Sequence, residues 1–260
     1  MASTSIRNKA VIRSNGSRHA SAYLLAVPNP GLNLVIESNS FRFLVRRRLC
    51  LPLYDPSRSP SPCPECHSAL LDPFGDHAEI CSHSSDRVSR HNSIRDVLGH
   101  YFCMAGSQII KEAPNVLPDS LQKPADIYCP VWRSCRPAAF DITVTSPVRG
   151  DIIPDAARVA GFASRQAERR KDAKYLEACR QQGIDFIPLC VETFGAWGSL
   201  ALSHFRTLIE RLAVLSGRSR SQESTYFFQR LSIALQRCNG SSMIRRVPRA
   251  RLNSSYEGKG

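Results

Sequence analysis

Three cysteines and one histidine lie close together in the sequence at a spacing typical of zinc ligands. Cys63 and Cys66 form a C-x2-C pair, and His77 and Cys81 follow after ten further residues. A C-x2-C pair places two thiolates on one tight turn, and a later histidine and cysteine can complete a tetrahedron. Because the segment is too short and polar to be stabilised by burial alone, metal binding must supply its folding energy. The sequence therefore predicts a structural zinc knuckle at residues 56–86.

Disulfide bonding and an unligated loop account less well for these cysteines. Residues 1–20 lack the apolar core of a signal peptide, and no apolar run is long enough for a membrane span. We therefore expect an intracellular protein, in which thiols stay reduced and disulfides are rare. An unligated loop with incidental cysteines does not account for four ligand-type residues within one short segment. His83 remains open as a competing ligand.

The chain carries a strong and uneven positive charge. The formal net charge of its 260 residues is +13, and the last 43 residues alone contribute +7. Such a balance is typical of a protein that meets a polyanion, above all nucleic acid, although a solvated basic surface without a partner is the alternative. The basic residues expected at nucleic acid in the two basic runs are Arg46, Arg47, Arg48, Arg245 and Arg246.

Hydrophobic spacing predicts alternating helices and strands in the middle of the chain. A helix begins near residue 87, three strands follow between 108 and 145, and then come a long helix at about 155–182, a strand at 184–192 and a helix at 199–215. This order indicates an α/β layer architecture. The expected parts are a basic N-terminal segment with one short helix (1–55), the zinc knuckle (56–86), the α/β domain (87–217) and a basic tail (218–260).

The two ends of the chain are harder to interpret. Residues 1–20 are polar and serine-rich, and we expect them to be disordered. Apolar residues in the tail can form a short helix. The pattern does not decide whether that helix packs on the domain or folds only on binding.

Two aspartates lie on neighbouring predicted strands. In residues 138–145, an alternation with period two places Asp141 on the face opposite Phe140. Asp126 begins the preceding strand. A lone aspartate of this kind is more often a surface acid, but two on adjacent strands can hold a divalent cation, and Glu112 is a candidate for a third ligand. Phosphodiester hydrolysis uses such a cation to polarise the phosphate and activate water.

The long predicted helix offers a positive charge for the same chemistry. Small and basic residues recur along it at intervals of three or four and form one seam. The seam consists of Ala156, Ala160, Ala163, Ala167, Lys171, Lys174 and Ala178. If this seam packs against the sheet, one of its two lysines can stabilise the negative charge that develops on the phosphate. The spacing does not choose between them.

These residues give the chain a resemblance to the restriction-like endonuclease domain of site-specific non-LTR retrotransposon proteins, a branch of the PD-(D/E)xK nuclease superfamily. The resemblance covers about residues 63–197. Besides the knuckle it includes RHNSI at 90–94, KPAD at 123–126, DITVT at 141–145 and KDAKY at 171–175. An alanine interrupts the usual Pro-Asp pair, and Thr143 stands where the superfamily usually has lysine.

The resemblance implies a restriction-endonuclease-like core, in which a central mixed sheet is flanked by helices. Asp126 and Asp141 would be the catalytic acids that bind Mg²⁺, and Glu112 would correspond to the acidic residue ahead of them. The missing lysine would be replaced by Lys174 or Lys171 on the following helix. Within RHNSI, Arg90 and His91 are further residues expected at nucleic acid.

The predicted function is therefore a magnesium-dependent DNA endonuclease that nicks a strand, contains structural zinc and acts in the nucleus. DNA is the expected partner, and RNA is the alternative. No YxDD-like motif of a reverse transcriptase is present, so the chain resembles only the C-terminal part of such a polyprotein. Two other hypotheses are a catalytically silent nucleic-acid-binding remnant and a decaying reading frame. Neither the target site nor the oligomeric state follows from the sequence.

Overall fold

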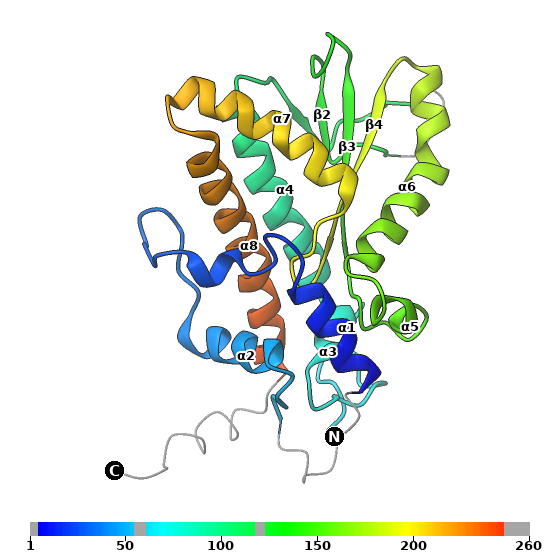
Figure 1. Ribbon diagram of the computed structural model, residues 1–260. Coiled ribbons are helices and arrows are strands. Elements are labelled where there is room, and N and C mark those ends of the chain that lie inside the picture. The colour runs from blue at the N-terminus through cyan, green and yellow to red at the C-terminus, as the bar shows by residue number, and fades with distance from the viewer. Residues whose placement is uncertain (1–4, 55–60, 118–122, 247–260) are drawn as a thin grey trace.

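A four-stranded mixed sheet lies at the centre of the protein, between helices (Figure 1). The computed structural model describes residues 5–54, 61–117 and 123–246. The strands are β1 (Ile110–Lys111), β2 (Ile127–Cys129), β3 (Ala138–Thr145) and β4 (Asp185–Glu192), and they lie in that order. The first two pairings are antiparallel and the β3–β4 pairing is parallel, with Phe140 opposite Ile187. The predicted α/β class is confirmed.

Both faces of the sheet are covered, which explains why β4 is an almost continuous apolar run. Phe140 and Ile142 of β3 point into the larger core. There they meet residues of α4 (Asp86–Met104), α7 (Ser199–Ser216) and α8 (Arg220–Arg245). The opposite face, which carries Ala139, packs against Tyr175 and Cys179 of α6 (Phe162–Gln181). The predicted alternation of faces along β3 is therefore confirmed.

The long predicted helix is interrupted near its beginning. A short helix, α5 (Ile153–Ala156), precedes α6, and Gly161 between them has a left-handed φ of +67°. The carboxylate of Glu192, at the end of β4, accepts hydrogen bonds from the backbone N–H groups of Ala163 and Ser164. Because a buried acid caps the helix at this point, α6 starts there rather than at residue 155. The cap is a long-range contact that helical spacing does not reveal.

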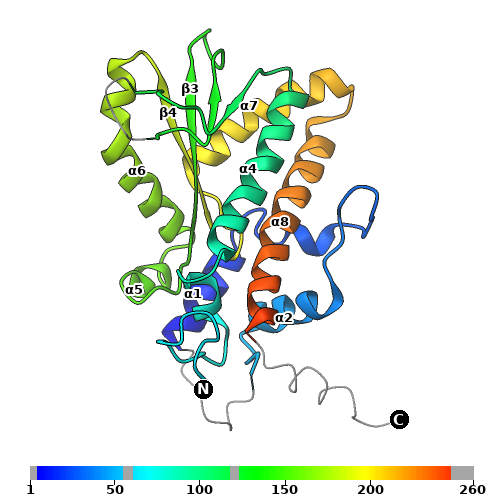
Figure 2. The same cartoon turned by 180° about the vertical axis from the view of Figure 1, so that it is seen from behind.

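Helix α8 belongs to the larger core, so the core does not end at the predicted boundary after residue 217. Ser219 and Gln222 form a capping box at its start. Phe227, Phe228 and Leu231 are buried beside aromatic residues of α4 and α7. Figure 2 shows α8 running beside α4 over much of its length. Its apolar residues are therefore used for packing, and the residues after Arg246 lie outside the described part.

The N-terminal segment is also ordered. It forms α1 (Ile6–Asn15), a 3-10 turn (Ala22–Leu25) and α2 (Ser38–Arg48), and the last of these is the short helix that we expected. The expectation of disorder over residues 1–20 is wrong for the described residues, because Ala10 and Val11 are fully buried. Among the described residues no helix is both long enough and apolar enough to cross a lipid bilayer.

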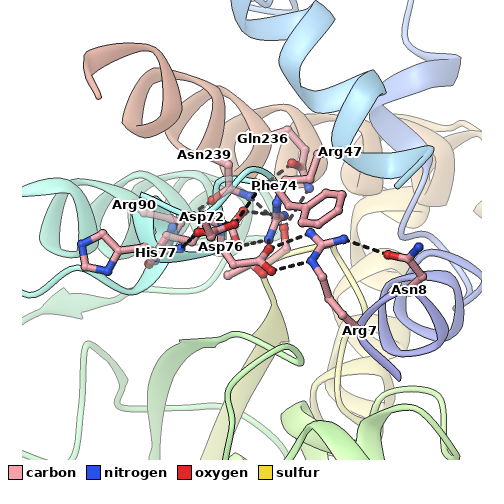
Figure 3. A network of polar contacts seen from close by, with 12 residues as sticks. Arg7, Asn8, Arg47, Asp72, Phe74, Asp76, His77, Arg90, Gln236 and Asn239 are labelled. Atoms are coloured by element: carbon pink, nitrogen blue, oxygen red, sulfur yellow. Dashed lines mark hydrogen bonds and ion pairs between the residues drawn. The ribbon is translucent and has the colours of Figure 1, made fainter. Parts of the chain in front are cut away.

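A buried ionic network connects these N-terminal helices to the predicted knuckle segment (Figure 3). Arg47 of α2 binds Glu79 in a bidentate pair, at 2.7 and 2.8 Å, and also contacts Asp76 at 3.1 Å. Arg7 of α1 holds the other side of Asp76 at 2.6 Å. Both acids lie on α3 (Asp76–Ile80). These contacts fix α1 and α2 against α3.

Three arginines that we expected at nucleic acid are buried instead. Arg47 is 2% exposed, Arg90 3% and Arg246 1%. Arg90 donates to the Glu79 carbonyl and the Asn239 amide oxygen, and Arg246 binds Asp86. A guanidinium buried in this way is stabilised by its protein partners and has no access to a phosphate. The prediction is wrong for these three residues because the sequence does not show where the acids of the fold lie.

The other predicted basic residues lie closer to the surface. Arg46 is exposed and donates to the Pro52 carbonyl, while Arg48 is partly buried and donates to Asn15. Arg245 is exposed and pairs with Asp86.

Neighbouring arginines allow a matched test of the buried network. We expect Arg47→Ala to lower the free energy of unfolding by about 3–5 kcal/mol, because Glu79 is left charged and buried. Arg46→Ala should cost about 1 kcal/mol or less, because this substitution removes only exposed hydrogen bonds. Urea denaturation of both variants measures the difference. Equal destabilisation by the two substitutions would contradict a network specific to Arg47.

Candidate functional site

The four predicted zinc ligands meet in space. The ligand atoms of Cys63, Cys66, His77 and Cys81 all lie within 4.8 Å of one another, and Cys66 Sγ is 3.4 Å from His77 Nε2. His83 lies outside this group and contacts Ser82. Three thiols and one imidazole form a typical tetrahedral zinc set without an open position. The group can therefore hold a metal such as zinc.

Local backbone structure positions both halves of this group. Cys63 N–H donates to the Ala69 carbonyl, and the Cys63 carbonyl accepts from His67 N–H, which forms the tight turn expected of a C-x2-C pair. His77 lies in the first turn of α3, and Cys81 is the residue that caps the C-terminal end of this helix. The Asp72 carboxylate caps α3 by accepting from three backbone N–H groups, including that of His77 at 2.7 Å.

Thiolate character is favoured at one cysteine of this cluster, Cys66. Hydrogen bonds from the Ser68 side chain and the Ala69 backbone lower the pKa of Cys66 to about 5. Burial raises the pKa of Cys81, and the nearby guanidinium of Arg246, just after α8, opposes this shift. Metal ligation requires deprotonated thiols, and such outer contacts orient them. Arg246 itself binds Asp86, the first residue of α4, so a charged contact with the α/β core lies beside the knuckle segment.

Metal content tests the cluster directly. We expect the purified protein to retain one zinc ion, and the double variant Cys63→Ser/Cys66→Ser to lose it, because two thiolate ligands are removed. The double variant Cys103→Ser/Cys135→Ser is a matched control, because both of these cysteines are exposed and lie outside the cluster. Elemental analysis of the three proteins gives the measurement. Equal zinc in all three would disprove this ligand set.

The two predicted catalytic aspartates come together at the α6 side of the sheet. Asp126 lies just before β2, and its Oδ2 accepts a 2.6 Å hydrogen bond from Ile142 N–H of β3. Asp141 is only 4% exposed, and its Oδ1 lies 2.8 Å from Lys171 Nζ of α6. Thr143 donates to the other oxygen of Asp141 at 3.1 Å. Burial raises the pKa of Asp141, and the charge of Lys171 opposes this shift.

Two further side chains reach Asp126. His91 of α4 places Nε2 3.2 Å from Asp126 Oδ1, and the Asp126 hydrogen bond raises the pKa of this imidazole, against the effect of burial. Glu112 follows β1, and its carboxylate lies within 4.8 Å of the ligand atoms of His91 and Asp126. Glu112 is also paired with Arg95 at 2.6 Å. His91, Glu112 and Asp126 thus form a second group that can hold a metal ion.

The structure distinguishes between the two lysines of the alanine seam. Lys171 is 29% exposed in its side chain and contacts Asp141. Lys174 is exposed, and its Nζ lies 4.6 Å from the centre of the Tyr175 ring. Only Lys171 is therefore placed to act with the aspartates in this conformation.

His91 was expected at nucleic acid, and its position beside Asp126 was not predicted. A histidine in the second turn of a helix carries no signal of its partner, because Asp126 is 35 residues away in the chain. The one available signal was the presence of His91 ahead of Glu112 and Asp126, because an imidazole and two carboxylates can together bind a metal ion. No model of a known protein family matches the chain, and no curated protein matches it significantly.

Proposed function

We propose that this protein is a metal-dependent DNA endonuclease. Asp126 and Asp141 would be the acids that carry out hydrolysis of the phosphodiester bond. The observation that carries the proposal is the convergence of two aspartates, one lysine, one histidine and one glutamate from several segments of the chain. Such groups are expensive to bring together in a fold, since each loses hydration and the acids repel one another. Perturbed, clustered ionisable groups of this kind are typical of catalytic sites.

The donor atoms fit a divalent cation. The carboxylates of Asp126 and Glu112 are hard oxygen ligands of the kind that Mg²⁺ takes, while the His91 imidazole also suits Mn²⁺ and other transition ions. Asp141 would complete the site on the β3 side. When bound, the cation supplies Lewis-acid polarisation of the phosphate and lowers the pKa of a water ligand.

The protein's own residues have separable roles. Ile142 N–H fixes one oxygen of Asp126, so the carboxylate is held in a defined orientation. The Lys171 ammonium balances Asp141 in the resting protein and is within reach of a phosphate that approaches the aspartates. A positive charge fixed beside Asp141 stabilises the negative charge of the pentacoordinate phosphorus in the transition state. Thr143, at the superfamily's usual lysine position, only supports Asp141.

We infer the origin of the domain from the resemblance to restriction-like endonucleases of non-LTR retrotransposons, together with the observed strand order. Helix α4, three antiparallel strands, helix α6 and a parallel fourth strand are consistent with a restriction-endonuclease-like core. The same origin favours DNA as substrate and a nuclear site of action.

The alternative is a catalytically silent nucleic-acid-binding domain. It is favoured by the direct contact of Lys171 with Asp141, because an ion pair of this kind can also persist as a purely structural contact. Turnover distinguishes the two functions.

Plasmid nicking is the decisive measurement. With supercoiled DNA and Mg²⁺ or Mn²⁺, we expect the wild type to nick, and Asp126→Ala and Asp141→Ala to be inactive. Lys171→Ala should lose about 10²–10³-fold in rate because one charge-stabilising group is removed. Lys174→Ala is the matched control and should change the rate by less than about threefold, which is under about 1 kcal/mol in the barrier.

Equal nicking by the wild type and both aspartate variants would indicate a contaminating nuclease and overturn the proposal. Equal nicking rates for Lys171→Ala and Lys174→Ala would show that Lys171 has no role in catalysis.

A further inference from the structure

An open groove lies between α1 and α5, away from the aspartates. Its volume is about 750 Å³, and three cations line it: Lys9 and Arg13 of α1, and Arg158, just after α5. Ile6 and Pro154 contribute apolar surface. No carboxylate is among the lining residues, although Asp155 of α5 is close in sequence. The groove is therefore a concave surface with positive charge on both sides.

The three cations differ from their neighbours in having no partner among the described residues. Within residues 5–54, 61–117 and 123–246, no hydrogen bond or ion pair involves the side chain of Lys9, Arg13 or Arg158, and all three are exposed. By contrast, Arg7 on the same helix pairs with Asp76, and Arg149 pairs with Asp151. Like charges that face one another repel, and an anion placed between them removes that cost.

We propose that this groove binds the phosphate backbone of DNA outside the reaction site. The proposal rests on the proposed nuclease function for the identity of the polyanion. Lys9 and Arg13 lie four positions apart on one helix, so their side chains start about 6 Å apart and can contact successive phosphates. Arg158 approaches from the other wall. Sequence-independent contacts of this type supply essentially all of the non-specific affinity of proteins for DNA.

The position of the groove suits DNA that also reaches the aspartates. Helices α1 and α5 lie side by side at the end of the molecule where α6 begins (Figures 1 and 2). From Phe162 to Lys171, α6 rises about 14 Å at about 1.5 Å per residue. This length corresponds to about four base-pair steps of about 3.4 Å. The groove would thus hold the duplex several base pairs from the scissile phosphate.

Salt-dependent binding tests this proposal with a matched pair of triple variants. The groove variant is Lys9→Gln/Arg13→Gln/Arg158→Gln. The control is Arg180→Gln/Arg206→Gln/Arg220→Gln, which removes the same charge from exposed positions on α6, α7 and α8. Affinity for a labelled duplex is measured by fluorescence anisotropy at several salt concentrations, with thermal unfolding as a check that all proteins are folded.

We expect the groove variant to bind at least about tenfold more weakly than the control at about 0.1 M salt. The slope of log affinity against log salt should fall by about 0.9 for each phosphate that the variant no longer neutralises, or by about 2.7 in total. Equal affinities and slopes for the two variants, or no DNA binding by the wild type, would overturn the proposal.

Two further measurements separate the possible outcomes. If polyglutamate of equal charge displaces the duplex as well as unlabelled DNA does, the groove recognises acidic chains in general, and its assignment to phosphates is wrong. Nicking by the wild type and Asp126→Ala is followed in parallel. If binding depends on the groove but the wild type does not nick, the groove proposal holds and the nuclease function fails. If the wild type nicks but the groove variant binds DNA as well as the control, the nuclease function holds and the groove proposal fails.

Discussion

The structure depends on one buried ionic contact, in which the Arg47 guanidinium meets Glu79 and Asp76. The buried Glu79 and the partly buried Asp76 both lie on the short helix α3, and they cannot remain charged there unless cations from other segments reach them. Arg47 and Arg7 come from the N-terminal helices, and Arg90 of α4 binds the Glu79 carbonyl. Because α3 also carries His77, the same contacts hold the cysteine-histidine cluster against the α/β core. The knuckle is therefore an integral part of the fold and not a separate module on a linker.

A second buried carboxylate performs a comparable role on the other side of the sheet. Glu192 caps α6 and accepts a short hydrogen bond of 2.5 Å from Ser14 of α1. Burial raises the pKa of Glu192, and its hydrogen bonds oppose that shift. The start of α6 is thus fixed relative to β4 and α1, and this places Lys171 opposite Asp141. The geometry of the candidate catalytic site and that of the basic groove have a common origin in this cap.

Local patterns predicted the elements of the sheet layer well. The alternation around Asp141 gave the correct face, because neighbouring side chains on a strand must point to opposite sides, and the knuckle ligands were recognisable from spacing alone. Patterns that depend on distant partners failed. Arg47, Arg90 and Arg246 looked like phosphate contacts, because no local feature reveals that Glu79, Asn239 and Asp86 lie beside them in the fold. The pairing of His91 with Asp126 was missed for the same reason, and the packing of α8 could not be decided from the sequence.

The position of α8 has a consequence for how the chain is made. The first helices pack on this last one: Tyr23 N–H donates to Ser232 Oγ, across 209 residues of sequence. At a synthesis rate of about 5–20 residues per second, about 10–40 s pass between synthesis of the N-terminal segment and that of its partner. During that interval its apolar side chains, such as Tyr23 and Leu44, have no core to enter. Contacts of such long range slow folding, and they leave the apolar surface of this segment open to aggregation during translation.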